Sequence, residues 1–293
     1  MKKIIVYLFA LTLLVGAWSC NKDEISGNSI FDNQDTPQNA FDEWLLMNYT
    51  YPYNIDFKYK LEDIESSFYY HLSPAKMENA VAMAKLIRYL WLEVYDQVGG
   101  VDFTRAYVPR IIHLIGSPGI QPNGTELLGT AEGGMKITLY KINELDVKAL
   151  SMDVLNEYYF KTIHHEFGHI LHQTKNYPSG FLQISSTDYI GTSWSGYEES
   201  LAKAYNLGFV SRYARSGVNE DFVETLAVYV TSTATQWETM LAASGTAGMV
   251  KIEKKFRMVK DYMAAAWNID IVALRDLVQE RSALLGQLKL TTL

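Results

Sequence analysis

The alternation of apolar and polar positions separates a short N-terminal segment from the rest of the chain. A basic start, Met1-Lys2-Lys3, leads into an apolar run from Ile4 to Trp18 that ends in small and polar residues. An apolar run of this length at the N-terminus is typical of a signal peptide and is short for a permanent membrane span. We therefore predict a signal peptide over residues 1–19, a flexible polar tether over residues 20–39 and a folded domain over residues 40–293.

Beyond the tether, the first clear pattern is helical and the next is extended. Ser73 and Pro74 are typical of a helix start, and apolar residues then recur at helical spacing as far as Gly99. Residues 107–115 are rich in β-branched and aromatic side chains and predict a strand, and residues 125–140 predict one or two more. The tyrosines between residues 40 and 60 are expected to pack at the edge of a core rather than to stack on sugars.

The pattern returns to a helical period from residue 152 to residue 173. One apolar stripe of this segment consists of Phe160, Ile163, Phe167 and Ile170. The remainder of the chain, to residue 293, is mostly helical apart from a loop-rich passage near residues 176–196. A helix, then strands, then a second long helix and further helices predict an α+β fold.

Composition changes this picture little, but charge narrows the range of partners. The apolar fraction of 48% is ordinary for a globular core. The formal net charge is −7, and it becomes two units more negative when Lys2 and Lys3 are removed with the signal peptide. Such a surface repels phosphate backbones, so nucleic acid is not an expected partner. Five basic residues have the spacing of a solvent-exposed helix face: Lys251, Lys254, Lys255, Arg257 and Lys260.

The one cysteine of the chain, Cys20, stands where a lipoprotein signal would be cut. Small residues precede it at Ala17 and Ser19, although Trp18 and the lack of an aliphatic residue at position 17 depart from the usual lipobox. We predict lipidation of Cys20 and anchoring to a membrane; an inert thiol after an ordinary signal is the alternative. The acidic cluster at residues 21–24 resembles export signals of surface lipoproteins in the Bacteroides group, and it is equally consistent with a plain tether.

The candidate chemistry lies in the segment His165-Glu166-Phe167-Gly168-His169 of the helix predicted over residues 152–173. Residues four apart share a helix face, so His165 and His169 can hold one zinc ion. Glu166 can then accept a proton from a water on the metal. A chance match is the alternative, but four of the six histidines fall between residues 164 and 172, which favours a metal site.

The neighbours of this motif carry weaker expectations. His164 is expected to point away from the ligand pair, as a helix-surface residue or a supporting one. His172 is expected to support a ligand or to be exposed, since three ligands would crowd one helix. Gly168 is unfavourable inside a helix, which predicts the close approach of another segment there.

A catalytic zinc needs a third protein ligand, which must come from elsewhere in the chain. The metzincin continuation would require glycine at position 172, where His172 stands. The best candidates are Glu220 and Glu224, which share one face of a predicted helix and could serve as a ligand and as the partner of a ligand histidine. Alternatively, these acidic residues only complement the positive end of the helix.

These residues together resemble a known family. The chain resembles the zinc metallopeptidase lipoproteins of gut Bacteroidetes, also called substrate-import-associated zinc metallohydrolases. The resemblance rests on residues 52–55, 128–134, 165–173 and 208–224. It implies a zincin-like, mostly helical domain with a small sheet, a Zn²⁺ cofactor, a peptide or protein substrate, and a place at the outer membrane beside components of nutrient uptake.

The site is also similar to that of anthrax lethal factor, where a tyrosine lies seven residues before a glutamate ligand and a second glutamate lies four residues after it. The same offsets here imply Glu220 as the third ligand, Glu224 as the hydrogen-bond partner of a ligand histidine, and Tyr213 as a hydroxyl donor to the oxyanion. Asp221 is the alternative ligand. Similarity to zincins also implies that the strand near residues 135–140 lies beside the cleft, where an extended substrate could add to it.

Three functions are consistent with these features. The first is a zinc metallopeptidase that cleaves peptide bonds at the cell envelope with Glu166 as the base. The second is a zinc-binding accessory lipoprotein of an outer-membrane uptake system with little or no catalysis. The third is hydrolysis of a non-peptide amide. The intact Glu166 favours catalysis, because a purely structural zinc site has no need of this carboxylate.

Overall fold

The computed structural model of the chain describes residues 39–62, 69–121, 126–127, 129–132 and 135–293. The predicted signal peptide, Cys20 and all of the predicted tether except residue 39 lie outside these described residues. Within the described part, no helix is both long and apolar enough to cross a membrane. The domain over these residues is α+β and mostly helical, as the sequence predicts.

The domain begins with a series of short helical turns. These are α2 (Ala40–Leu45), the π-helical turn η1 (Leu46–Thr50) and α3 (Tyr51–Tyr53). Asn39 and Asp42 form a capping box in which each side chain accepts a hydrogen bond from the other end of the first turn. Tyr49, Tyr53 and Tyr59 are buried, so the prediction of core packing is confirmed for them, whereas Tyr51 is 72% exposed.

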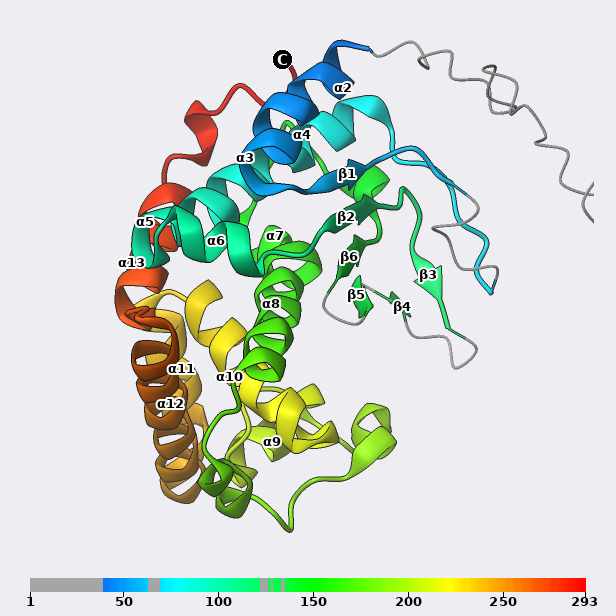
Figure 1. The fold of residues 1–293 in the computed structure, drawn as a ribbon. Coiled ribbons are helices and arrows are strands. Elements are labelled where there is room, and N and C mark those ends of the chain that lie inside the picture. Colours follow the sequence, from blue (N-terminus) through cyan, green and yellow to red (C-terminus); the bar gives the residue numbers. More distant parts are fainter. Residues whose placement is uncertain (1–38, 63–68, 122–125, 128, 133–134) are drawn as a thin grey trace, which may run out of the picture. The chain divides into compact units, whose positions relative to one another are not determined.

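A four-stranded sheet lies at the centre of the N-terminal half, in the order β1-β2-β6-β5 (Figure 1). Its strands are β1 (Asp56–Lys58), β2 (Ile111–Leu114), β6 (Lys136–Leu139) and β5 (Gly129–Glu132). β1, β2 and β6 are parallel, and β5 pairs antiparallel with β6 at the edge. A separate pair consists of β3 (Gly119–Ile120) and β4 (Glu126–Leu127). Strands are confirmed within residues 125–140, but the described residues there form three (β4, β5 and β6) where one or two were predicted.

Two details of the predicted elements are wrong. The helix expected after Ser73 and Pro74 begins only at Met77, because Pro74 pairs with Ile115 in an isolated β-bridge instead. The strand expected over residues 107–115 is shorter, since residue 107 still belongs to a helix. The helices of this region are α4 (Met77–Ile87), η3 (Arg88–Leu92), α5 (Glu93–Gly99) and α6 (Val101–Tyr107).

The second half of the chain is helical, and its elements succeed one another with short connections. After η4 (Ile142–Glu144), the predicted helix over residues 152–173 is present as α7 (Met152–Leu155), the π-helical turn η5 (Asn156–Phe160) and α8 (Lys161–Thr174). The loop-rich passage and the segment after it contain η6 (Ser179–Ile184), η7 (Gly191–Ser195), α9 (Leu201–Leu207), η8 (Tyr213–Ser216) and α10 (Val218–Thr231). The chain continues with α11 (Ala234–Ala243), α12 (Gly245–Trp267), α13 (Ile271–Ser282) and η9 (Leu285–Gln287).

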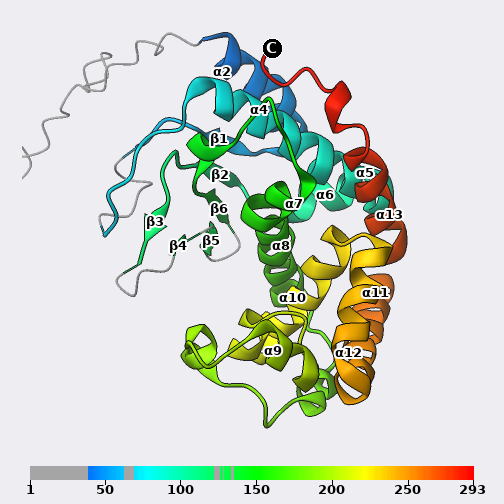
Figure 2. The ribbon, with the colours of Figure 1, turned by 180° about the vertical axis from the view of Figure 1, so that it is seen from behind.

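Helix α8 occupies the middle of the core and lies beside α10 in both views of the ribbon (Figures 1 and 2). The predicted apolar stripe is confirmed, because Phe160, Ile163 and Phe167 are buried and Ile170 is partly buried against the same core. Phe167 packs edge-on against Trp91 and Tyr95 from the N-terminal helices. The opposite side of α8 is therefore held toward α10 and toward strand β5, with which α8 is also in contact.

The predicted exposed face of basic residues on α12 is wrong at one position. Lys255 is fully buried, and its ammonium group lies 2.7 Å from a carboxylate oxygen of Asp221 on α10. It also donates a hydrogen bond to the carbonyl of Gly208 and lies over the ring of Phe209. Helical spacing identified the face correctly for its neighbours, but it could not identify a buried partner that is distant in sequence.

Candidate metal centre

Two imidazoles from α8 and one carboxylate from α10 meet at a single point. His165 Nε2 and His169 Nε2 lie 3.2 Å apart. Glu220 Oε2 lies 3.0 Å from the first nitrogen and 3.2 Å from the second. Four ligands at tetrahedral positions around zinc, each about 2.0–2.1 Å from the ion, are separated by about 3.4 Å. The triangle of donor atoms therefore fits a single zinc ion and leaves a fourth position for a non-protein ligand.

Close contact between α8 and α10 makes this convergence possible. A Cβ atom on residue 168 would lie 3.0 Å from Val223 Cγ1, which is tighter than ordinary van der Waals contact. Gly168 therefore lets the α10 backbone approach α8 one turn away from the donor atoms, as its unfavourable place in a helix predicts. A larger residue at position 168 would push α10 away and increase the distance between the two histidines and Glu220.

Glu224 lies one turn further along α10 and holds the first histidine in place. Its Oε1 accepts a hydrogen bond of 2.9 Å from His165 Nδ1, and its Oε2 accepts a short one from the Ser211 hydroxyl. Burial opposes its ionisation, but the charge of Lys161 and the hydrogen bond from His165 lower the pKa of Glu224 to about 2. An ionised Glu224 fixes the hydrogen of His165 on Nδ1, so the lone pair of Nε2 faces the donor triangle.

The donor triangle is also a site where a cation competes with a proton. Burial disfavours the charged form of His165, but Glu220 and Glu224 raise its pKa to about 9. The same histidines hold the pKa of Glu220 well below its usual range, although burial acts against this. A metal ion that binds these groups must displace the proton, so metal binding releases protons and weakens in acid.

The second histidine has a partner that sequence reasoning left open. His169 Nδ1 lies 2.9 Å from His172 Nε2, and His172 is buried against the rings of Tyr177 and Phe222. Burial, and then the charge of His169, lower the pKa of His172 to about 4. A neutral His172 can accept the hydrogen of His169 Nδ1, which leaves His169 Nε2 free for a metal ion. His172 is therefore neither exposed nor a further donor to the triangle.

The expectation that His164 points away from the ligand pair is confirmed, but it does not lie on the helix surface. It is fully buried, its Nδ1 lies 3.1 Å from the Tyr95 hydroxyl, and burial lowers its pKa to about 3. Asp221, the alternative ligand, is directed to the buried Lys255 rather than to the histidines. Asp221 also accepts a hydrogen bond of 2.8 Å from the Tyr189 hydroxyl.

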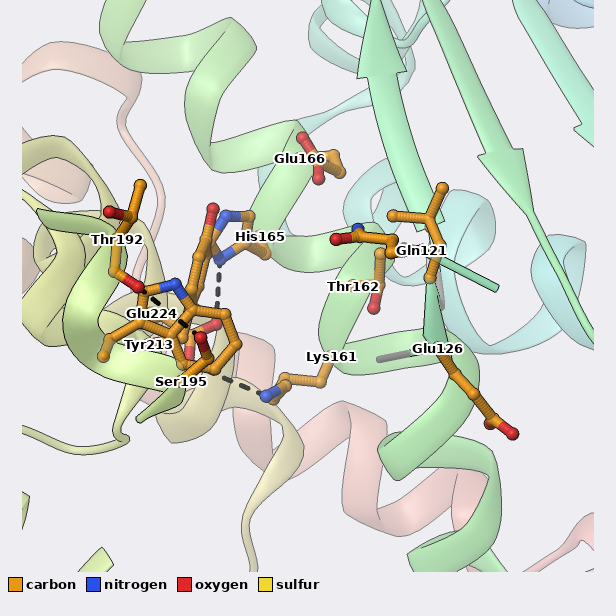
Figure 3. Close-up of a pocket in the computed structure, with 13 residues that line it drawn as sticks. Gln121, Glu126, Lys161, Thr162, His165, Glu166, Thr192, Ser195, Tyr213 and Glu224 are labelled. Carbon is orange, nitrogen blue, oxygen red and sulfur yellow. Dashed lines mark hydrogen bonds and ion pairs between the residues drawn. The ribbon is translucent and has the colours of Figure 1, made fainter. Parts of the chain in front are cut away.

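A cleft of about 460 Å³ opens beside the donor triangle (Figure 3). Glu166 lines it, and the donor atoms of His165, Glu166 and His169 all lie within 4.8 Å of one another. Burial raises the pKa of Glu166, which favours a carboxylate able to take up a proton. The other lining residues are Gln121, Glu126, Leu127, Gly129, Lys161, Thr162, Thr192, Trp194, Ser195, Tyr213 and Glu224.

Tyr213 lines this cleft beside His165, with its ring 5.7 Å from that of His165 and edge-on to Trp194. Burial, and then the charge of Glu220, raise the pKa of Tyr213, so its hydroxyl stays protonated. The strand that borders the cleft is not the expected one but its neighbour in the sheet. β6 lies inside the sheet, and β5, which begins at Gly129, is the edge strand that borders the cleft.

The α+β domain thus brings two imidazoles and a carboxylate to one point beside a cleft, a geometry that fits a mononuclear metal site of the kind found in zinc hydrolases. Residues 34–272 match the model of a protein family described as "Putative zinc-binding metallo-peptidase". The match covers most of the chain, so the chain belongs to this family of zinc-binding metallopeptidases.

A solved structure supports the same assignment. It is described as "a putative zinc-binding metallo-peptidase from Bacteroides caccae ATCC 43185" and is 46% identical in sequence to this chain. The alignment covers 90% of this chain and 99% of that one, with a TM-score of 0.76. No curated protein matches the chain. The resemblance stated from the sequence and the zinc cofactor that it implies are thus confirmed at the level of the family.

Proposed function

We propose that the protein is a zinc-dependent peptidase in which His165, His169 and Glu220 hold the metal ion. The observation that carries this proposal is the triangle of donor atoms, with sides of 3.0, 3.2 and 3.2 Å, beside a cleft that Glu166 lines. A bound zinc ion supplies a Lewis acid that polarises a carbonyl and acidifies water. The remaining steps belong to side chains of the chain itself.

Glu166 is the proposed general base and acid. Its carboxylate takes a proton from the attacking water and returns it to the amide nitrogen as the peptide bond breaks. The raised pKa of Glu166 favours this exchange, because a carboxylate of ordinary acidity holds a proton less readily. The Tyr213 hydroxyl, which burial keeps protonated, donates a hydrogen bond to the substrate oxygen as negative charge develops on it.

An extended peptide would be bound along the edge strand β5. β5 pairs with β6 on one side and begins at the cleft, so a substrate strand can add through main-chain hydrogen bonds on the other side. This places the scissile bond between the sheet edge and α8. Main-chain recognition of this kind is largely independent of sequence, so side-chain preference must come from the walls of the cleft.

The experiment that tests this function is cleavage of a mixed peptide library, followed by mass spectrometry, with zinc-loaded wild type and Glu166→Gln. We expect cleavage by wild type, its loss after chelation and recovery with zinc, and a loss of at least 10²-fold in Glu166→Gln. Glu157→Gln, at an exposed position of η5, is the matched control and should keep full activity. Full activity of Glu166→Gln would refute the mechanism. Stoichiometric zinc without cleavage of any peptide would favour the accessory function instead.

We further propose that the mature protein is anchored through lipidated Cys20 at the outer membrane and serves nutrient uptake there. The support is the basic and apolar N-terminal segment followed by the single cysteine. Fractionation of cells that express wild type or Cys20→Ala tests the anchor. Wild type should be found with the outer membrane, and the variant should be released. Equal distribution of the two proteins would contradict the proposal.

A further inference from the structure

One lysine lies in the wall of the cleft, one helical turn before the first metal-binding histidine. Lys161 begins α8, and its side chain is 35% exposed. Figure 3 shows its side chain directed toward Glu224 and Ser195, with a dashed line for the ion pair with Glu224. Its ammonium nitrogen is 3.6 Å from Glu224 Oε2, which is beyond hydrogen-bond distance. The three N–H donors of Lys161 thus make no hydrogen bond to the described residues.

Three carboxylates of the described residues line the cleft, of which Glu166 is the proposed base and the other two have hydrogen-bond partners. Glu126 binds the ammonium group of Lys141 at 2.6 Å, and in Figure 3 its carboxylate points away from His165. Glu224 accepts hydrogen bonds from His165 and Ser211. Lys161 is the one lysine or arginine among the described lining residues, and its neighbours there are mainly neutral hydroxyl, amide and apolar groups.

The charge of Lys161 also favours the ionised form of Glu224, with which it forms an ion pair at 3.6 Å. This long contact makes no hydrogen bond, and the ammonium group is partly exposed to the cleft. Its N–H donors are therefore available to an acceptor on a ligand bound there. The acceptor must be an anion small enough to sit beside the donor triangle.

We propose that Lys161 binds a carboxylate of the substrate next to the scissile bond, so that the peptidase prefers acidic peptides. This inference rests on the proposed function. The carboxylate is either an Asp or Glu side chain or the C-terminal carboxylate of a short peptide, since both present the same pair of oxygens. In either case the ammonium group of Lys161 and the hydroxyls of Thr162 and Ser195 face the bound anion.

The experiment uses peptides built around a cleavage site that the library has identified. At each position flanking the bond, Glu is compared with Gln and with Lys, and each peptide has a free or an amidated C-terminus. We expect wild type to favour Glu over Gln by about tenfold in kcat/KM at one position, mostly through KM, which is the order supplied by a hydrogen bond to a charged group. Dependence on the free C-terminus alone would identify the terminal carboxylate as the ligand.

The variants Lys161→Gln and Lys161→Glu assign the preference to this residue. The first should remove the discrimination between Glu and Gln with zinc content unchanged, and the second should shift the preference toward Lys among the molecules that retain zinc. Lys254→Gln, at an exposed position of α12, is the control and should behave as wild type.

Three results overturn the inference. The first is that wild type cleaves the Glu, Gln and Lys peptides equally, with either C-terminus. The second is that Lys161→Gln keeps the wild-type preference for Glu over Gln. An equal loss of kcat on all peptides in Lys161→Gln would show that Lys161 acts through Glu224 and not on the substrate. Absence of any cleavage by zinc-loaded wild type is a separate result, which sinks the proposed function itself.

Discussion

Replacement of His172 by phenylalanine tests whether zinc affinity depends on the partner of a ligand. The substitution keeps a ring in the pocket beside Tyr177 and Phe222 but removes the nitrogen that lies 2.9 Å from His169 Nδ1. His169 is then left with a donor that lacks its acceptor, which costs about 1–3 kcal/mol when the group is buried. Loss of such partners lowers metal affinity by about 10–100-fold. We therefore expect the Kd for zinc to rise by about 10–100-fold.

Competition with a chelating dye of known zinc affinity measures this change. His164→Phe is the matched control, because His164 is buried on the same helix but bonds to Tyr95 and not to the donor triangle. It should lose stability while its zinc affinity stays close to wild type. His172→Gln keeps a hydrogen-bond acceptor and should lose less affinity than His172→Phe. A Kd for His172→Phe within about threefold of wild type, in a folded protein, would refute the reasoning.

Two further predictions concern stability. Lys255→Met leaves Asp221 buried without its cation and should lower the free energy of unfolding by about 3–5 kcal/mol. The double variant Lys255→Met, Asp221→Leu removes both charges and should lose less stability. Equal losses for the two proteins in a denaturant titration would contradict this. Burial opposes ionisation of Asp42, but hydrogen bonds from the Tyr59 hydroxyl, the backbone N–H of residue 39 and the Lys60 ammonium hold its pKa below 3.8. Its ionised form therefore stabilises the fold at neutral pH and loses this effect as the pH falls through the folded-state pKa. Asp42→Asn should lower the melting temperature at pH 7 but not in strong acid, and a pH-independent difference would count against this account.

The sequence predicted the elements whose pattern is local. The apolar stripe of α8 and the four-residue spacing of its histidines depend only on helix geometry. The α+β class followed from the succession of helical and extended patterns. Gly168 correctly predicted that another segment approaches α8 closely, because glycine destabilises a helix interior and close packing explains its presence there.

Pairings across long sequence distances were not available from pattern alone. Lys255 has the spacing of an exposed residue, yet a carboxylate 34 positions away on α10 makes its burial favourable. The edge position of β5 depends on strand order, which the alternation of residues does not encode. The spacing of Glu220 and Glu224 was ambiguous until the resemblance to a known site was added, because acidic residues also favour the first turn of any helix.

Two contacts of the site are consistent with helical spacing alone. His172 comes three positions after His169, a spacing at which helix side chains touch, so a hydrogen bond between the two was a readable possibility. Lys161 lies four positions before His165 and shares its face for the same reason. Helical spacing does not tell which element packs against that face of α8. In the structure this element is α10.

A metal ion shared by His165 and Glu220 would join two points that are 55 residues apart in the chain. Between the end of α8 and the start of α10, all of which the structure describes, the longest helix is α9, and this stretch supplies Thr192, Trp194 and Ser195 to the cleft. None of these three residues belongs to the donor triangle, but a bound ion would add a link between the two helices that bracket the stretch carrying them. We therefore expect metal loading and substrate binding to be coupled, so that a chelator weakens binding of a non-cleavable peptide as well as cleavage.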